Sequence, residues 1–279
     1  MYEIYEEAKN SLQLPNLLVV APTGSKFSTI QEAITYAKTK YDVLNENVTI
    51  FVKNGIYNVE PTNVYPYAPI AKGANRISII GESKEGVIIN CTNTGTTQSK
   101  VMDIGGPCII ENLTINCLRD NSYTIDKDLK HNCYCIHNDS NYKTNEKYTT
   151  TVKNCKLYSE CHSPVGAGLR NNQTQIYENV ETISNGILSA GSLYVHAPAN
   201  AGDENCSVII NNCNCLSKDK TKALTLPDVA GTLSYKLIDT TVQRTIVASN
   251  GNKVIDDSFQ LGHKMTDLCA LNNNENLNK

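Results

Sequence analysis

The chain has 279 residues, and its 25 basic and 28 acidic side chains give a formal net charge of −3 without a long run of either sign. This balance excludes the strongly basic surface that binds nucleic acid or an anionic membrane. No apolar run approaches the ~18 residues of a membrane span, so we expect no membrane insertion. Asn, Thr, Ser, Tyr and Ile are abundant and Trp is absent, which is typical of strands with polar outer faces joined by turns.

The two ends of the sequence are polar. It begins MYEIYEEAKN, where a secretory signal would have a cationic stretch followed by an apolar one. We therefore expect synthesis without a signal peptide and an N-terminal arm over residues 1–16. A single domain is predicted for residues 17–256. The ending NNNENLNK indicates a C-terminal tail over residues 257–279.

The first clear element lies in FSTIQEAITYAK (27–38), where apolar residues recur at helical spacing. Either Thr29 with Glu32 or Ser28 with Gln31 can form a capping box at its beginning. This predicts a short amphipathic helix that starts near Ser28. Apolar strand runs follow in 47–60 and 76–91, so the helix would cover the open end of a stack of strands.

A repeat then occupies much of the chain. The segments IIENLTI (109–115), TVKNCKL (151–157), IYENVET (176–182) and VIINNCN (208–214) share an asparagine before an apolar position. The shared residues are Asn112, Asn154, Asn179 and Asn212, at intervals of 42, 25 and 33 residues. Irregular periods of this size, with strands but no helices between them, predict a parallel β-helix, because stacked coils bury apolar positions that one coil cannot bury alone.

The sequence contains eleven cysteines. Their number is odd and the chain is longer than a typical disulfide-stapled scaffold, which argues against a disulfide framework. The pairs Cys133-x-Cys135 and Cys213-x-Cys215 lack the spacing of a zinc knuckle. Other cysteines lie within strand runs, where a reduced thiol behaves as a small hydrophobe: Cys91, Cys117 and Cys155. We expect reduced core cysteines, no metal and no cofactor.

A second series of strand segments lies between the asparagine segments: CYCIHN (133–138), GAGLRN (166–171), SLYVHA (192–197) and KALTLP (222–227). His137, Arg170 and His196 each end such a segment. Residues at corresponding points of successive coils line one face, so these three are candidates for a polar column there. Such a column would bind an anionic or hydroxyl-rich glycan, with the Arg fork suited to a carboxylate. The alternative is that these side chains form a solvent-exposed row on the outer face of the sheet and bind no ligand.

The opening motifs resemble those of pectin-lyase-like right-handed parallel β-helix proteins, and most closely the pectin methylesterase branch. In that family F-x-T-I-Q-x-A-I precedes I-x-V-x-x-G-x-Y and a strand ending in I-I-G, as FSTIQEAI, IFVKNGIY and ISIIG do here. The resemblance covers roughly residues 17–245. It implies a right-handed all-β solenoid with a short N-terminal capping helix.

The same resemblance implies that the catalytic set of the esterases is lost. Aligning Leu169-Arg170 and LYVH (193–196) on the family motifs puts Val165 at the first family glutamine. Ala190 and Gly191 then stand at the second glutamine and the acid, and Leu224 stands near the nucleophilic aspartate. None of these side chains can attack an ester, shuttle a proton or hold an oxyanion. The interpretation leans against an enzyme and assigns no catalytic residue.

Loops between the strand segments carry tyrosines among Asn, Asp and Lys, a combination that binds sugars. The glycan-binding candidates there are Tyr123, Tyr142 and Tyr148, with Tyr65 and Tyr67 in an earlier loop. The alternative is that these loops only pack against one another and bind no sugar. Carboxylates at Asp126, Asp128 and Asp139 would support glycosidase chemistry only if two of them met in one cleft, and their spacing matches no calcium loop.

A β-helix without an export signal, with a decayed esterase site and a short leading arm, is similar to bacteriophage tail and baseplate proteins. We therefore predict a virion component, made in the host cytoplasm, that binds cell-surface polysaccharide and contacts other virion proteins. A homotrimer is expected, because a β-helix leaves strand edges open at its ends. The alternatives are a polysaccharide depolymerase or carbohydrate esterase with a rearranged site, and a purely structural virion protein. Convergence of carboxylates in one cleft would favour the enzyme.

Overall fold

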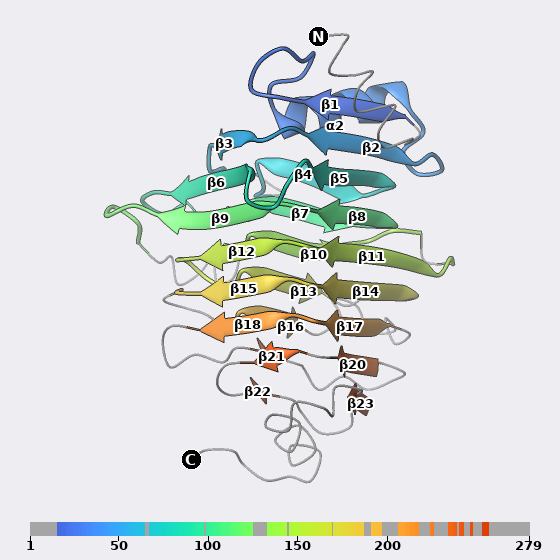
Figure 1. Cartoon of the computed structure of the whole chain (residues 1–279), viewed down its shortest axis with the longest axis vertical. Coiled ribbons are helices and arrows are strands. Elements are labelled where there is room, and N and C mark those ends of the chain that lie inside the picture. Colours follow the sequence, from blue (N-terminus) through green and yellow to red (C-terminus); the bar gives the residue numbers. More distant parts are fainter. Residues whose placement is uncertain are drawn as a thin grey trace.

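The strands recur in a fixed order of three, and each turn of the chain adds one strand to each of three parallel sheets (Figure 1). The computed structural model describes residues 16–64, 67–97, 99–124, 133–143, 145–168, 170–186, 191–196, 206–217, 224–225, 234–238, 240–242, 246–247 and 253–256. This architecture confirms the predicted right-handed parallel β-helix. The arm and tail expected at residues 1–16 and 257–279 lie outside the described residues, apart from Asn16.

Sheet A contains the strands that run along one side of the stack. They are β1 (Leu17–Val20), β2 (Val48–Val52), β5 (Ile77–Gly81), β8 (Cys108–Glu111), β11 (Tyr148–Lys153), β14 (Gln173–Glu178), β17 (Ser207–Asn211), β20 (Ser234–Ile238) and β23 (Lys253–Asp256). A strand of sheet B follows each of these except β1, which precedes the N-terminal helix, and β23, which is the last described strand. Sheet B contains β3 (Gly55–Val59), β6 (Val87–Asn93), β9 (Thr114–Arg119), β12 (Lys156–Ser159), β15 (Glu181–Ser184), β18 (Asn214–Ser217) and β21 (Thr241–Val242).

Sheet C closes each coil and carries the residues of most interest below. Its strands are β4 (Ile70–Ala74), β7 (Met102–Gly105), β10 (Ile136–Ser140), β13 (Val165–Gly168), β16 (Leu193–His196), β19 (Leu224–Thr225) and β22 (Ile246–Val247). Along these strands inward residues such as Ile136, Val165 and Leu193 are fully buried and pair in register across the coils. Outward residues alternate with them, as the pleat requires.

The helix α2 (Ile30–Lys40) lies between β1 and β2 at the N-terminal end of the stack (Figure 1). Of the two capping boxes that the sequence allowed, the one that forms joins Thr29 and Glu32. The Glu32 amide donates to Thr29 Oγ1 at 3.2 Å, and the Thr29 amide donates to Glu32 Oε2 at 3.1 Å. The helix packs its apolar face against β1, β2 and β4, which confirms the predicted end cap.

The repeated asparagines form the corners between sheets A and B. Asn112, Asn154, Asn179 and Asn212 have φ of 58°, 51°, 53° and 48°, the left-handed region that asparagine tolerates better than most residues. Each is followed by a buried inward residue: Leu113, Cys155, Val180 and Cys213. The asparagine repeat therefore fixes both the corner and the first core position after it.

Ten cysteines are within the described residues, and all ten are free and buried. The core they share with Ile, Val and Leu side chains is continuous along the stack. Burial raises the pKa of the Cys91 and Cys155 thiols to about 12. The prediction of reduced cysteines in the core is thus confirmed for these ten.

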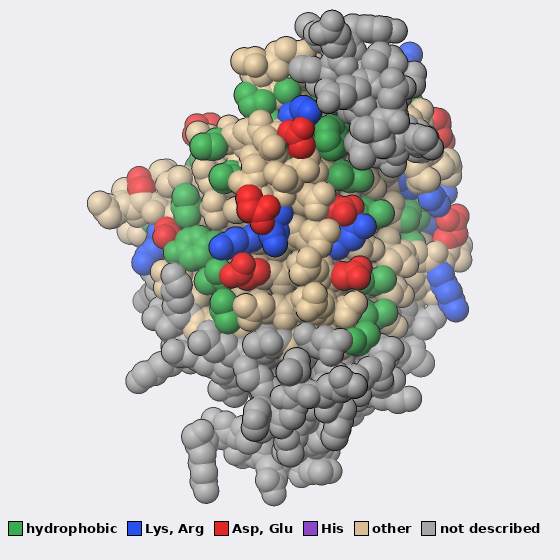
Figure 2. Space-filling view, in the orientation of Figure 1, with side chains coloured by type: hydrophobic (Ala, Val, Ile, Leu, Met, Phe, Trp, Pro, Cys, Tyr) green, Lys and Arg blue, Asp and Glu red, His purple; other side chains and the backbone are tan. Residues whose placement is uncertain are grey.

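Acidic and basic side chains are intermixed on the face of the molecule that Figure 2 shows. Ion pairs link successive coils, as Lys153 on β11 does to Glu111 on β8, with 3.1 Å between Nζ and Oε2. Such exposed pairs contribute little to stability, about 0–1 kcal/mol each. Among the described residues, no helix is long and apolar enough to cross a membrane.

Candidate functional site

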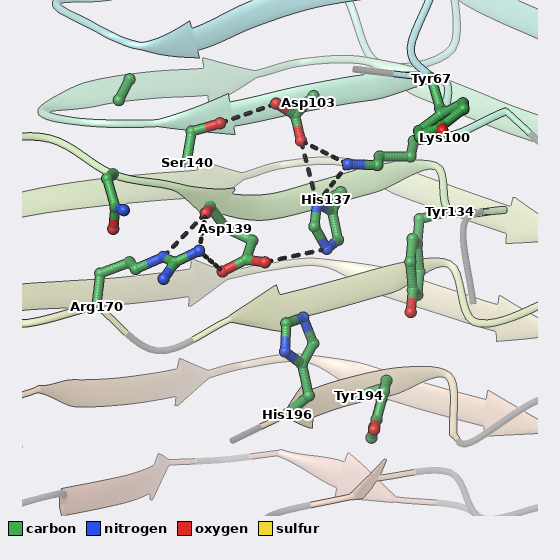
Figure 3. A pocket seen from close by; sticks show the side chains of 12 residues that line it. Tyr67, Lys100, Asp103, Tyr134, His137, Asp139, Ser140, Arg170, Tyr194 and His196 are labelled. Atoms are coloured by element: carbon green, nitrogen blue, oxygen red, sulfur yellow. Dashed lines mark hydrogen bonds and ion pairs between the residues drawn. The ribbon is translucent and has the colours of Figure 1, made fainter. Parts of the chain in front are cut away.

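A polar groove of about 750 Å³ lies on the outer face of sheet C (Figure 3). Its charged and aromatic lining comes from four successive coils and includes Lys100, Asp103, His137, Asp139, Arg170, Tyr194 and His196. Three of these, His137, Arg170 and His196, were predicted from the sequence as a polar column. The structure brings all three to the same groove.

Two glycines open the groove at its centre. Gly166 and Gly168 occupy the outward positions of β13, and they alternate with the inward, buried residues Val165 and Ala167. A Cβ atom at Gly166 would lie 2.7 Å from the Tyr134 ring, and one at Gly168 would collide with the Asp139 carboxylate. Only glycine therefore lets the side chains of the neighbouring coils meet over this strand.

The three predicted residues do not stand at equivalent points of successive coils, as the sequence analysis assumed. His137 is opposite Gly166, which is opposite Tyr194, whereas His196 is opposite Gly168. The His137 and His196 rings nevertheless stack, with centroids 5.5 Å apart and planes at 14°. They reach one another across β13 because the glycines leave that space empty.

His137 is held from above by a buried carboxylate that the sequence analysis did not single out. Asp103 on β7 lies with Oδ1 at 3.0 Å from His137 Nδ1 and at 3.2 Å from Lys100 Nζ, and its Oδ2 accepts from Ser140 Oγ at 2.8 Å. Burial opposes ionisation of Asp103, but His137, Lys100 and Ser140 outweigh it and lower the pKa of this carboxyl. Lys100 Nζ also lies 3.1 Å from His137 Nδ1. In the tautomer that donates Nδ1–H to Asp103, the Nε2 lone pair of His137 is directed into the groove, towards Asp139.

Asp139 enters the groove through an irregularity of β10. The register between β10 and β7 shifts between Asn138 and Ser140, so Asp139 has no partner in β7 and its side chain is re-aimed. Arg170 donates from Nε and Nη2 to the Asp139 carbonyl at 2.9 and 2.7 Å, and Nη2 lies 2.7 Å from Oδ1. The other oxygen, Oδ2, lies 3.7 Å from His137 Nε2.

Aromatic rings form one wall of the groove, as Figure 3 shows. Tyr134 stacks on His137 with centroids 5.1 Å apart, and Tyr194 lies against His196 at 5.5 Å. Tyr134 is almost fully buried, whereas Tyr194 is partly exposed. Tyr67, which the sequence analysis placed in a tyrosine-bearing loop, also lines the groove.

The three loop tyrosines proposed as glycan contacts are not brought to this groove. Tyr142 is buried and donates its hydroxyl to the Leu44 carbonyl at 2.7 Å, and Tyr148 is buried against its ring. Tyr123 packs against the core with its hydroxyl 3.6 Å from Cys133 Sγ. Their sequence context was that of a polar surface, but Tyr142 and Tyr148 are buried and Tyr123 is partly buried against the core.

Three of the positions aligned with esterase catalytic residues, Val165, Gly191 and Leu224, are not among the residues that line the groove. Val165 and Leu224 point inward and are fully buried, because each is the inward residue of its strand. Ala190 lies outside the described residues. Two of the aligned positions are thus core positions, and the groove carries carboxylates of its own, Asp103 and Asp139, on either side of His137.

These new residues left a weak signal in the sequence. Asp103 is a charged residue inside the apolar strand segment VMDIGG, and the alternating glycines of VGAG mark a close approach. Of the three loop aspartates considered for catalysis, Asp139 is the one that reaches the groove, whereas Asp126 and Asp128 lie outside the described residues. Asp103 and Asp139 line the same groove, and each lies beside one ring nitrogen of His137.

The fold and the groove together define a right-handed parallel β-helix protein with one ionisable groove on sheet C. No protein-family model matches the chain, and no curated protein matches it either. Solved structures similar to it include three pectin methylesterases. That of Erwinia chrysanthemi is 14% identical over 85% of this chain and 80% of its own, with a TM-score of 0.48. The carrot enzyme is 15% identical over 87% and 88%, with a TM-score of 0.47.

The third of these structures, from Aspergillus niger, is 13% identical over 89% of this chain and 88% of its own, with a TM-score of 0.49. Identities this low concern the fold, which the three parallel sheets already establish. The groove itself therefore has to supply the evidence for a function.

Proposed function

We propose that the groove on sheet C binds a saccharide. The observation that carries this proposal is the meeting of partly exposed aromatic rings with fixed charged groups in one groove: Tyr194, His196, His137, Asp139 and Arg170. Ring faces give apolar contact with a sugar ring, while carboxylate and imidazole groups hydrogen-bond its hydroxyls. The strands hold these groups rigidly, so little conformational entropy is lost on binding.

The test is a titration of the protein with defined oligosaccharides, in which calorimetry measures the binding. We expect Tyr194→Ala to weaken binding about tenfold, because an aromatic contact is worth about 0.5–1.5 kcal/mol beyond its area. Tyr158→Ala is the matched control, since Tyr158 is a partly exposed tyrosine on β12 of sheet B. Equal affinities for the two variants, or no binding of neutral or acidic oligosaccharides by the unmodified chain, would contradict the proposal.

A second candidate function is hydrolysis of the bound saccharide. The specific observation in its favour is that His137 Nε2 faces Asp139 Oδ2 at 3.7 Å, while Asp103 holds the opposite ring nitrogen. One group can take a proton and the other can attack or activate water. We expect Asp139→Asn to lower any release of reducing ends or methanol from pectic substrates by about 100-fold or more. If Asp139→Asn released these products as fast as the unmodified chain, the groove would not be the site of hydrolysis.

The setting that we propose for this binding is a bacteriophage tail, baseplate or appendage, with a homotrimer as the assembled form. The support is the sequence resemblance together with the open strand edges that end a β-helix. Light scattering between low and high micromolar concentration should give the mass of three chains. A constant monomer mass, together with normal incorporation of a chain lacking residues 1–16 into particles, would contradict both the trimer and the role of the arm.

A further inference from the structure

We propose that the groove also holds a divalent first-row transition metal ion, such as Zn²⁺, on His137, Asp139 and His196. One ligand atom from each of these residues lies within 4.8 Å of the other two. No metal was predicted from the sequence, because the cysteine pairs lack the spacing of a zinc knuckle and the loop aspartates match no calcium loop. These ligands instead come from coils that are separated in the sequence and stacked in space.

The distances between the proposed ligand atoms are slightly longer than those around a bound zinc ion, so the ligands would move closer together on binding. Zn–N and Zn–O bonds of about 2.0–2.2 Å place neighbouring ligand atoms about 3–3.5 Å apart. His137 Nε2 and Asp139 Oδ2, at 3.7 Å, already approach this spacing. The nitrogen of His196 has to move by about an ångström, which a change in its side-chain torsions supplies.

Asp103 and Arg170 contact the proposed ligands in the way that neighbouring residues orient the ligands of known metal sites. A ligating histidine usually gives its second ring nitrogen to a carboxylate, and Asp103 Oδ1 lies 3.0 Å from His137 Nδ1. Arg170 holds Asp139 Oδ1 at 2.7 Å, which leaves Oδ2 for the ion and restricts Asp139 to one coordinating oxygen. This second set of contacts is independent of the spacing of the three ligands.

The charges around the groove select the kind of ion. Lys100 and Arg170 balance Asp103 and Asp139, so the site offers no excess of negative charge to a hard ion. Calcium and magnesium need several oxygen ligands, whereas two imidazoles with one carboxylate suit zinc and its neighbours. Gly168 keeps the space between Asp139 and His196 clear, and the groove leaves positions on the ion open to water or a saccharide hydroxyl.

The test is calorimetric titration of the chelator-treated full chain with ZnCl₂ and, separately, with CoCl₂, under reducing conditions. We expect one ion per chain, and a visible Co²⁺ spectrum without thiolate charge-transfer absorption. Asp139→Asn and His196→Gln should each weaken binding by at least about 100-fold, and Asp103→Asn by about 10–100-fold. Gly168→Ala should also abolish binding, although all three ligands are retained, because its Cβ would meet Asp139 and lie 2.7 Å from His196 Cε1.

Tyr158→Phe is the control, because Tyr158 lies on β12 of sheet B, is not among the residues that line the groove, and loses only a hydroxyl. It should leave the affinity for metal unchanged. Thermal unfolding in the presence of chelator shows whether each variant is folded. A Co²⁺ spectrum with thiolate bands, or an affinity equal in Asp139→Asn, His196→Gln and the unmodified chain, would overturn the metal site.

The proposal of a metal site and the proposal of a saccharide site can be refuted independently of each other. Tyr194→Ala tests the saccharide without removing a metal ligand, and metal titration requires no saccharide. A chain that binds saccharide but no Zn²⁺ or Co²⁺ therefore refutes the metal site alone.

Discussion

Cys213→Asp should lower the free energy of unfolding by more than about 3 kcal/mol, because it places an unpaired carboxylate in the packed core. Cys213 follows the corner residue Asn212 and is 3% exposed. The corresponding residue two coils earlier, Cys155, is fully buried. Urea unfolding at neutral pH, followed by circular dichroism, measures the loss.

Asn212→Asp is the matched control for this prediction. It places the same carboxylate one residue earlier, on an exposed corner with φ of 48°, which Asp tolerates nearly as well as Asn. We expect a change within about 0.5 kcal/mol for this surface position. Equal stabilities of the two variants would show that residue 213 does not face the core.

The second large effect is a loss of stability at alkaline pH. Burial raises the pKa of the Cys91 and Cys155 thiols to about 12 and that of Cys215 to about 11, whereas an unfolded thiol titrates near 8.5. Because the folded pKa values are raised, this stability is present below about pH 8.5 and is lost as pH rises towards 11–12. The three thiols together should cost about 4–6 kcal/mol between pH 7 and pH 10, comparable to the whole stability of many domains.

Urea unfolding at several pH values with a reductant present measures this loss. Cys91→Val removes one titrating thiol, so the free energy of unfolding of the variant should fall less steeply with pH, by about 1.4 kcal/mol per pH unit at most. An Asn212→Asp chain should follow the unmodified protein. A slope that Cys91→Val leaves unchanged would show that this thiol does not contribute.

Part of the site could be predicted from the sequence. His137, Arg170 and His196 end strand segments of the same series, and their common groove follows from the repeat. Their relative register did not follow, because the series placed GAGLRN (166–171) opposite the wrong residues of CYCIHN (133–138) and SLYVHA (192–197). Pairing Ile136 with Val165 and Leu193 moves His196 two residues out of line with His137. A repeat of varying length specifies that strands stack but leaves a shift of two residues open, since both registers keep the same residues inside.

The sequence by itself determined the parallel β-helix, the capped helix at its first end and the buried cysteines. These features depend on local patterns: helical spacing with a capping box, alternation along strands and asparagine at the corners. The tertiary structure alone decided the groove. Asp139 reaches it through a shifted register, His137 meets His196 across two glycines, and the loop tyrosines Tyr142 and Tyr148 turn inward. Each of these depends on contacts between coils distant in sequence, which no local pattern specifies.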